Sequence, residues 1–381
     1  MQQPDGYRHH SSTSFLVLLF AAGLLVGSLA TFYINLQEVN RLNDQVQILQ
    51  SQVSVLNGGG GNVSAQNITI YQNSTDLAQI YSNVRDSVVL VQGTASDGTG
   101  VQGSGFVYQF QDRMVVITNY HVVQDTAGLS VTFSNGQGYA ATTLGSDPYA
   151  DLAVVSVNNA PAEMFKPVDI VSSTTLGVGD QVIAIGNPYG LVGSLTTGIV
   201  SAVGRTITED TAGGFSIANI IQTSTPINPG NSGGPLLNAL GNVVGITTAI
   251  VSESQGLGFA VPSNTILREI TALVTSGSYS GHSYLGVTGS DMSYDVAREI
   301  SSNYTYGWRL ATVVAGGPSD GKLQVDDIII ALNGNLIRNN DDLASYLEEH
   351  TLPNQSLTVT VARGNQQVQV TLTLGVRPAP T

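Results

Sequence analysis

Three segments of the chain carry the residue types of a catalytic triad, in the order histidine, aspartate, serine. His121 follows an apolar run that ends at Thr118, Asp151 stands directly before the apolar run Leu152–Val155, and Ser232 lies much further along the chain. A serine hydroxyl is a weak nucleophile until an imidazole accepts its proton, and the imidazole needs a buried carboxylate that orients it and stabilises its positive charge. The combination predicts acyl-transfer chemistry with Ser232 as the nucleophile.

The serine lies in a glycine-rich loop, Asn228–Pro235. Acyl transfer needs backbone N–H groups that converge on a developing oxyanion, and glycine permits such close approach because it has no Cβ. The amides of Gly230 and Ser232, with Asn231 between them, are the candidates for this oxyanion hole.

Each segment alone is weak evidence. A histidine after an apolar strand is often structural, an aspartate before a strand often ends a turn, and a Gly-Asn-Ser-Gly-Gly loop occurs in many settings. Their conjunction favours an active triad over an inactive descendant that keeps only the fold. The spacing also leaves room for a barrel of strands around the histidine and aspartate and for a second barrel before the serine.

The stretch from about Tyr81 to Leu374 resembles the HtrA/Deg family, trypsin-like serine proteases with a C-terminal PDZ domain. The resemblance implies His121 as the general base, Asp151 as its orienting partner and Ser232 as the nucleophile, with the loop amides at the oxyanion hole. Besides the three catalytic segments, it rests on five motifs in family order, namely Gly103–Phe106, Gly186–Leu191, Gly198–Ser201, Ile221–Thr223 and Gly256–Pro262.

The segment 76–277 must supply the strands that position these residues. Short runs rich in Val, Ile, Thr and Ala alternate there with Gly, Asn, Asp and Ser turns. This pattern predicts a mainly β, chymotrypsin-like double β-barrel with the catalytic cleft at the junction of the barrels. Apolar residues on one face of 264–276 predict a helix that closes the domain.

Substrate preference is indicated only in part. By the resemblance, the base of the primary specificity pocket lies about six residues before the nucleophile, at Pro226, where enzymes for basic side chains carry an aspartate. With no carboxylate there, and with Ile227 and Ile250 expected nearby, we expect a small or medium apolar side chain at the cleavage site. The alternative is a different loop geometry in which Pro226 faces elsewhere. Segment 204–216 matches the family's regulatory loop in position.

The segment 278–376 changes character and resembles one PDZ domain, followed by a short tail, 377–381. In this resemblance the loop Tyr284-Leu285-Gly286-Val287 presents N–H groups to a peptide's C-terminal carboxylate, and a helix bearing Leu343 and Leu347 contacts the peptide side chains. The alternative is a PDZ fold that acts only as a spacer. A peptide C-terminus is therefore an expected partner.

The N-terminus predicts export. After a cytoplasmic tail, 1–14, the run 15–33 is uncharged and apolar and matches the roughly 20 residues that a bilayer requires. We interpret it as a single-pass transmembrane anchor with the catalytic domain outside the cytoplasm. The alternative is a cleaved signal peptide, since Ser28-Leu29-Ala30 resembles a cleavage site.

Two further segments separate the anchor from the catalytic domain. In 34–57, apolar residues recur at spacings of three and four from Val39 to Leu56, which predicts a short coiled-coil stalk or, alternatively, one amphipathic helix lying on its own domain. Valine and leucine at the positions of the coiled-coil seam favour a two-stranded coiled coil, whereas the family that the chain resembles is typically trimeric. We expect a homotrimer. The linker 58–75 begins with four glycines and carries three glycosylation sequons.

Composition excludes several classes of function. The net charge of −14, with only two lysines, Lys166 and Lys322, opposes binding to nucleic acid phosphates. The chain has no cysteine, so disulfides and thiolate metal sites are absent. Only His9 and His10 are close together among the histidines, in a polar tail, and we expect no metal site and no cofactor.

Together these features predict a membrane-anchored serine endopeptidase that cleaves misfolded or unfolded proteins outside the cytoplasmic membrane, with the PDZ domain recognising substrate or regulating cleavage. One alternative is a chaperone-like holdase or peptide-sensing scaffold with low or conditional proteolytic activity. Another is a regulatory protease with one dedicated membrane-protein substrate.

Overall fold

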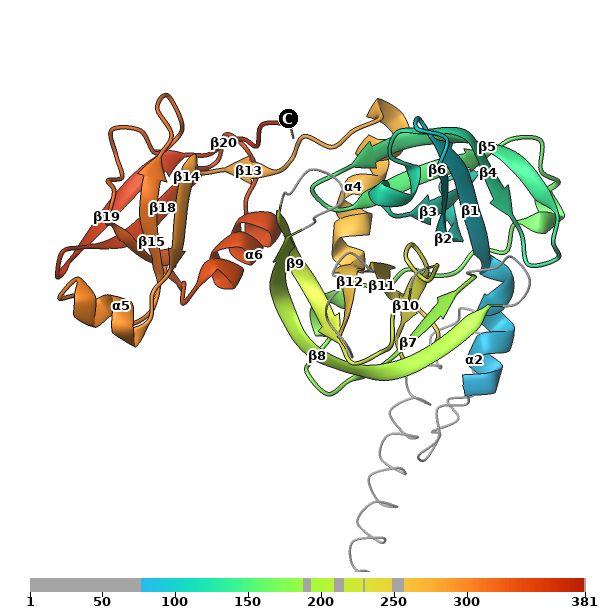
Figure 1. The fold of residues 1–381 in the computed structure, drawn as a ribbon, viewed down its shortest axis with the longest axis horizontal. Coiled ribbons are helices and arrows are strands. Elements are labelled where there is room, and N and C mark those ends of the chain that lie inside the picture. Colours follow the sequence, from blue (N-terminus) through green and yellow to red (C-terminus); the bar gives the residue numbers. More distant parts are fainter. Residues whose placement is uncertain (1–76, 188–192, 209–215, 229, 249–256, 380–381) are drawn as a thin grey trace, which may run out of the picture. The chain divides into compact units, whose positions relative to one another are not determined.

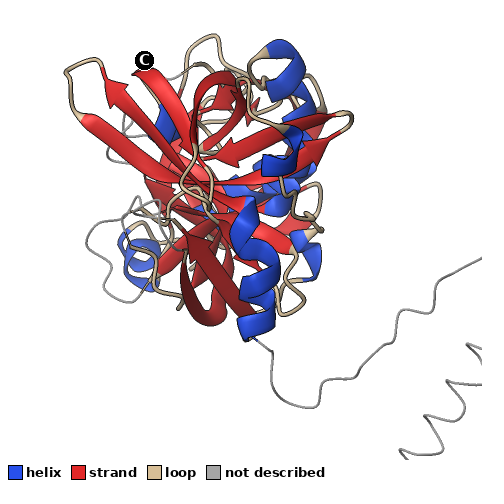
Figure 2. Ribbon diagram, turned by 90° about the vertical axis from the view of Figure 1, so that its right-hand side faces the viewer, coloured by secondary structure: helices blue, strands red, loops and turns tan. Residues whose placement is uncertain are grey.

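The computed structural model describes residues 77–187, 193–208, 216–228, 230–248 and 257–379 (Figure 1). All of them belong to one compact unit, Asn73–Thr381. Most of its regular secondary structure is strand, with a few short helices between the strands (Figure 2). The mainly β class predicted from the sequence is confirmed.

The predicted anchor 15–33, the stalk 34–57 and the linker 58–75 with its sequons all lie outside the described residues, as does the cytoplasmic tail. Among the helices that the structure does describe, none is both long enough and apolar enough to cross a membrane. The predictions for the N-terminal segments therefore stay predictions.

The first barrel follows helix α2 (Leu77–Val84) and a 3-10 turn. Its six antiparallel strands close in the order β1-β2-β3-β6-β5-β4. A one-turn helix, α3 (Tyr120–Val123), separates β3 from β4. The strand bounds are β1 Val88–Ala95, β2 Gly100–Phe110, β3 Arg113–Thr118, β4 Thr126–Thr132, β5 Gly138–Asp147 and β6 Leu152–Val157.

The second barrel repeats this arrangement with strands in the order β10-β11-β12-β9-β8-β7. Helix α4 (Ser263–Ser276) follows it, one residue longer at its start than the predicted closing helix, and ends at Gly277 in the left-handed conformation. The strand bounds are β7 Gln181–Gly186, β8 Ser194–Thr208, β9 Ser216–Thr223, β10 Pro235–Leu237, β11 Val243–Thr248 and β12 Gly258–Pro262.

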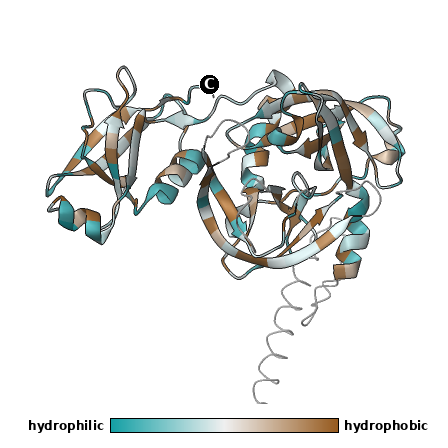
Figure 3. Ribbon diagram, viewed as in Figure 1, coloured by the Kyte–Doolittle hydropathy of each residue, from teal (hydrophilic) through white to brown (hydrophobic). Residues whose placement is uncertain are grey.

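Apolar residues recur along the barrel strands (Figure 3), and the first four residues of β1 are buried on both faces of the strand. In β1, Val89 and Val91 pack inside the first barrel. Their neighbour Val88 joins a different cluster, in which residues of the second barrel and of α4 also lie, among them Ile183 and Ile266. Fully burying one such side chain stabilises the fold by roughly 1.5 to 3 kcal/mol. This shared cluster of apolar side chains therefore stabilises the contact between the two barrels.

The C-terminal domain is a partly open sheet with two helices. Strands β14-β15-β16-β18-β19 form the sheet, β17 pairs with β16, and β13 pairs separately with β20. The bounds are β13 Ser283–Tyr284, β14 Val287–Asp291, α5 Tyr294–Glu299, β15 Trp308–Val313, β16 Ile328–Leu332, β17 Asn335–Leu336, α6 Asn340–His350, β18 Ser356–Arg363, β19 Gln366–Thr373 and β20 Gly375–Val376. The groove predicted for a peptide lies where β14 and α6 approach each other.

Candidate active site

The turn after β3 places the His121 imidazole within hydrogen-bonding distance of the Asp151 carboxylate. Nδ1 of the imidazole lies 3.0 Å from Oδ1 and 2.9 Å from Oδ2 of the carboxylate, and the His121 backbone N–H donates to Oδ1 at 3.0 Å. The preceding Asn119 is fully buried and its Nδ2 donates to the Asp151 carbonyl at 2.9 Å. Two segments remote in sequence are therefore locked together by both backbone and side-chain bonds.

The carboxylate of Asp151 is built to accept hydrogen bonds. The residue is 2% exposed, its backbone adopts the left-handed region with φ +48°, and Thr248 of β11 donates its hydroxyl to Oδ2 at 2.9 Å. Because the carboxylate accepts from Nδ1 of His121, the imidazole proton lies on Nδ1 and the basic lone pair lies on Nε2. This is the tautomer that a general base requires.

The loop that carries Ser232 is tied to β2 of the other barrel. Ser104 donates its backbone N–H to the Ser232 carbonyl at 2.7 Å and its hydroxyl to the Gly230 carbonyl at 2.6 Å. The same hydroxyl accepts the N–H of Asn187 at 2.7 Å, and Ser104 is fully buried. One side chain thus fixes the serine loop and the end of β7.

Gly103 explains how the nucleophile segment comes so close to the histidine segment. A Cβ at this position would lie 2.6 Å from Cγ2 of Val122 and 3.1 Å from the Ser232 carbonyl oxygen. Val122 directly follows His121 in the chain. Val122 and the Ser232 carbonyl therefore both pack against the backbone of β2 at Gly103. A side chain at this position would push both of them away from the strand.

The hydrogen bonds of the serine loop distinguish between the amides that were predicted for the oxyanion hole. The N–H of Asn231 donates to the Asn228 carbonyl at 2.9 Å, inside the loop. That amide is committed to the turn, so Gly230 and Ser232 are the better candidates for donors to an oxyanion.

Of the three residues predicted for the specificity pocket, Pro226 has an exposed side chain, and its carbonyl accepts the hydroxyl of Thr196 at 2.9 Å. Ile227 is half-buried against the apolar core of the second barrel. Ile250 lies outside the described residues, as does most of the predicted regulatory loop.

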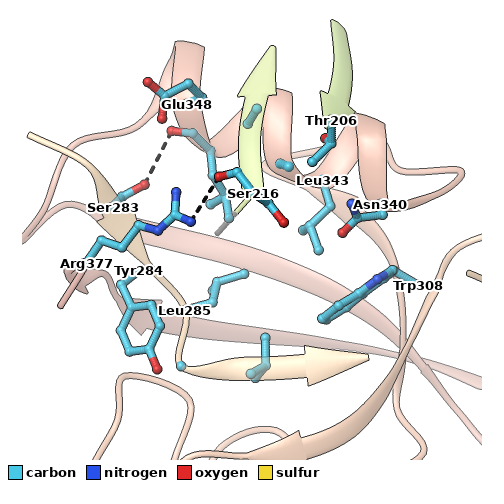
Figure 4. Close-up of a pocket in the computed structure, with 15 residues that line it drawn as sticks. Thr206, Ser216, Ser283, Tyr284, Leu285, Trp308, Asn340, Leu343, Glu348 and Arg377 are labelled. Carbon is cyan, nitrogen blue, oxygen red and sulfur yellow. Dashed lines mark hydrogen bonds between the residues drawn. The ribbon is translucent and has the colours of Figure 1, made fainter. Parts of the chain in front are cut away.

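A pocket of about 190 Å³ lies at the predicted peptide groove (Figure 4). All six residues predicted to bind peptide line it: Tyr284, Leu285, Gly286, Val287, Leu343 and Leu347. The lining residues that sequence reasoning missed include Trp308 of β15, Ser216 of β9, Glu348 of α6, and Arg377, which was assigned to the tail. Arg377 stands in a Pro-rich stretch that gave no sign of packing.

Sequence reasoning also missed a buried ionic cluster. Donor atoms of Asp147, Glu269 and His282 lie within 4.8 Å of one another, a grouping able to hold a metal ion. His282 is 4% exposed, bonds directly to Asp147 through Nε2, and lies 3.0 Å from Glu348 through Nδ1. Arg268 pairs with Glu269 and Glu348. The predicted absence of a metal site overlooked this cluster, because its members come from four distant segments.

Burial and mutual contacts shift the pKa values of several members of this cluster. Burial disfavours the charged form of His282, but its hydrogen bonds to Asp147 and Glu348 outweigh this effect and raise its pKa to about 10. Burial would raise the pKa of Glu348, but its bond to His282 and the Arg268 charge lower that pKa to about 2. Burial raises the pKa of Glu269 well above its usual range. The positive charges of Arg268 and His282 therefore lie against the acidic side chains of this cluster.

We expect His282→Gln to remove a pH-dependent part of the stability. Because the folded pKa lies above the ordinary value of 6.5, the charged imidazole stabilises the fold fully below about pH 6.5, and this contribution disappears as the pH rises through about 10. The variant should lose on the order of 3 kcal/mol at pH 6, and much less at pH 10. Denaturant unfolding across this range measures the difference. His350→Gln, at an exposed histidine, is the matched control, and a difference for His282→Gln that is constant with pH would contradict the assignment.

Residues 103–246 match the trypsin-like peptidase domain, and residues 283–374 match the PDZ domain. A relative named probable periplasmic serine endoprotease DegP-like, from Chlamydia pneumoniae, is 38% identical over 286 residues, which are 73% of this chain and 56% of that protein. The chain therefore combines a trypsin-like peptidase domain with one PDZ domain, and it is similar to DegP-like and HtrA-type serine proteases.

Two further proteins show the same similarity. Protease Do-like 1, chloroplastic, from Arabidopsis thaliana is 34% identical over 72% of this chain and 64% of its own length. The chain thus spans only about half to two thirds of the length of these two HtrA/Deg relatives. The solved structure of the HtrA-type protease AlgW with a tripeptide superimposes with a TM-score of 0.65 at 29% identity, and covers 81% of this chain and 99% of that one.

Proposed function

We propose that this chain is a serine endopeptidase that cleaves peptide bonds through an acyl-enzyme intermediate. The observation that carries the proposal is the pair of His121 and a buried Asp151, set beside the Ser232 loop through the shared contact at Gly103. In this account Ser232 attacks the peptide carbonyl, His121 accepts its proton and later donates it to the leaving amine, and Asp151 holds the imidazolium.

The oxyanion of the tetrahedral intermediate would accept hydrogen bonds from the N–H groups of Gly230 and Ser232. Such donors act without reorganisation because the loop holds them in place before the reaction. The bonds from Ser104 to the Gly230 and Ser232 carbonyls support this role, since they orient both peptide units of the loop.

We further propose that the substrates are unfolded or misfolded proteins outside the cytoplasm. An extended chain can lie in a cleft between two barrels, whereas a folded one cannot. The names of the relatives, periplasmic endoproteases, support this location, and so does the apolar run 15–33 if it anchors the chain in a membrane. We also propose that the chain assembles into a homotrimer. We propose that it prefers a small or medium apolar side chain at the cleavage site.

Degradation of denatured casein tests the activity. We expect the full-length protein to cleave it and Ser232→Ala to leave it intact, with aggregation of a denatured client followed in parallel. Cleavage by both proteins, or by neither, would overturn the endopeptidase. Suppressed aggregation by both without any cleavage would favour the holdase instead.

We expect the groove of the PDZ domain to bind peptide C-termini through their carboxylate. A peptide with a free carboxylate should bind at least about tenfold more tightly than the same peptide with a C-terminal amide, because backbone N–H groups of Tyr284–Val287 would lose a charged acceptor. Fluorescence anisotropy with both peptides measures the ratio. Leu343→Asp should weaken both peptides, whereas equal affinity of the two for the unmodified domain would point to internal segments or a spacer role.

A further inference from the structure

The catalytic aspartate ends a tight turn whose first residue is also buried. Asp147 closes β5, and its Oδ1 accepts the N–H of Tyr149 at 2.9 Å. The N–H of Asp151 donates to the Pro148 carbonyl at 3.2 Å, and Asp151 itself has φ +48°. Since the turn contains only five residues and two internal hydrogen bonds, displacing its start displaces the carboxylate at its end.

His282 holds the start of this turn. This residue directly precedes β13, the first strand of the C-terminal domain. Its Nε2 bonds to Asp147 Oδ2 at 2.5 Å, and its Nδ1 bonds to Glu348 Oε2 of α6 at 3.0 Å. The imidazole thus links the turn to the helix that forms one wall of the peptide groove.

Arg377 holds the middle of the turn. Its guanidinium carbon lies 3.8 Å from the centre of the Tyr149 ring, and Nη2 donates to the Ser216 carbonyl at 3.1 Å. Its backbone N–H donates to the His282 carbonyl at 2.9 Å. The Tyr149 hydroxyl also donates to the Pro378 carbonyl. The two residues that contact the turn, His282 and Arg377, are therefore also hydrogen-bonded to each other.

Arg377 lines the pocket directly, and His282 adjoins it through its partner Glu348 and its chain neighbour Ser283. Glu348 and Arg377 line it together with Ser283, the residue after His282, and Ser216, which accepts from Arg377 (Figure 4). In the pocket wall, Arg377 contacts the turn of the catalytic aspartate directly, and Glu348 is linked to it by two hydrogen bonds through His282.

We propose that His282 and Arg377 are positioning residues for Asp151, because they fix the turn that ends at this residue. This inference rests on the proposed function and names two residues that support its catalytic pair. The turn Asp147–Asp151 transmits the position of these two residues to the catalytic carboxylate.

The test compares His282→Gln and Arg377→Gln with Arg309→Gln, which removes an exposed ion pair with Asp326 elsewhere in the C-terminal domain. The substrate is a short fluorogenic peptide with an amidated C-terminus. We expect kcat to fall roughly tenfold in the first two variants with KM within about twofold, since misplaced catalytic groups act on the chemical step. The control should keep both constants. A kcat within about twofold of the unmodified protein in both folded variants would overturn the proposal.

Tyr149 supplies a second pair of variants in case loss of the buried histidine prevents folding. Tyr149→Phe keeps the ring beneath Arg377 and should keep kcat, whereas Tyr149→Ala removes it and should behave as Arg377→Gln does. Equal kcat for the two Tyr149 variants would contradict the role of the stack.

Two readouts separate this inference from failure of the proposed function, because neither needs turnover. The downfield proton resonance of His121 Nδ1–H should shift or broaden in Arg377→Gln, and the Asp151 amide should exchange with deuterium faster. If the unmodified protein cleaves nothing, these readouts still test the link. An unchanged resonance and unchanged exchange would overturn it even where the enzyme is active.

Discussion

Asp151→Asn should lower kcat by about 10⁴-fold without unfolding the protein. The carboxylate accepts from three donors, the backbone N–H and Nδ1 of His121 and the hydroxyl of Thr248. An amide has only one acceptor oxygen, so its NH₂ group would face a donor, and the imidazole would turn to the tautomer that cannot accept the serine proton. Steady-state hydrolysis of a fluorogenic peptide measures this loss.

Asp97→Asn is the matched control, since Asp97 is an exposed aspartate that caps a turn in the same barrel by accepting from the Thr99 N–H. Its kcat should stay within about twofold of the unmodified value. If Asp151→Asn kept more than about a tenth of the activity, the carboxylate would not be the partner of the base.

The second large effect is expected at Gly233, directly after the nucleophile. Its φ of +84° strains any residue with a Cβ, and a Cβ there would lie 2.0 Å from the Ser104 carbonyl oxygen and 2.5 Å from the Thr118 hydroxyl. Gly233→Ala must therefore push the serine loop away from β2. We expect a loss of on the order of 3 kcal/mol in the free energy of unfolding and loss of most activity, even at temperatures where the variant is folded.

Gly136→Ala separates backbone strain from the clash. Gly136 has φ +83°, and a Cβ there would meet nothing within 4 Å. It should therefore lose only about 1 kcal/mol and keep its activity. Equal losses in the two variants, measured by denaturant unfolding, would mean that contact with Ser104 does not fix the loop.

The sequence predicted much of this architecture because its signals are local. Short apolar runs between turn residues predicted the barrels, and the motifs around His121, Asp151 and Ser232 identified the segments that the fold brings together. The six residues predicted for the peptide groove line one pocket, since they lie on a loop and on one helical face whose spacing is visible in the sequence.

The supporting contacts could not be predicted, because they join residues without any shared pattern. Thr248 donates to the catalytic carboxylate from the other barrel, and nothing in the β11 sequence distinguishes it from its neighbour Thr247. Ser104 stood in a recognised motif, but its bonds to the serine loop depend on tertiary placement. Nothing in the sequence singled out His282, although charged side chains from three other segments of the chain surround it.

The most direct test of the central claim is covalent labelling with a fluorophosphonate, which reacts with a serine only when a neighbouring base activates it. Mass spectrometry of the labelled full-length protein should find one adduct, on Ser232, and His121→Gln should abolish it. A folded protein that forms no adduct, or that labels Ser232 equally well without the imidazole, would contradict the account.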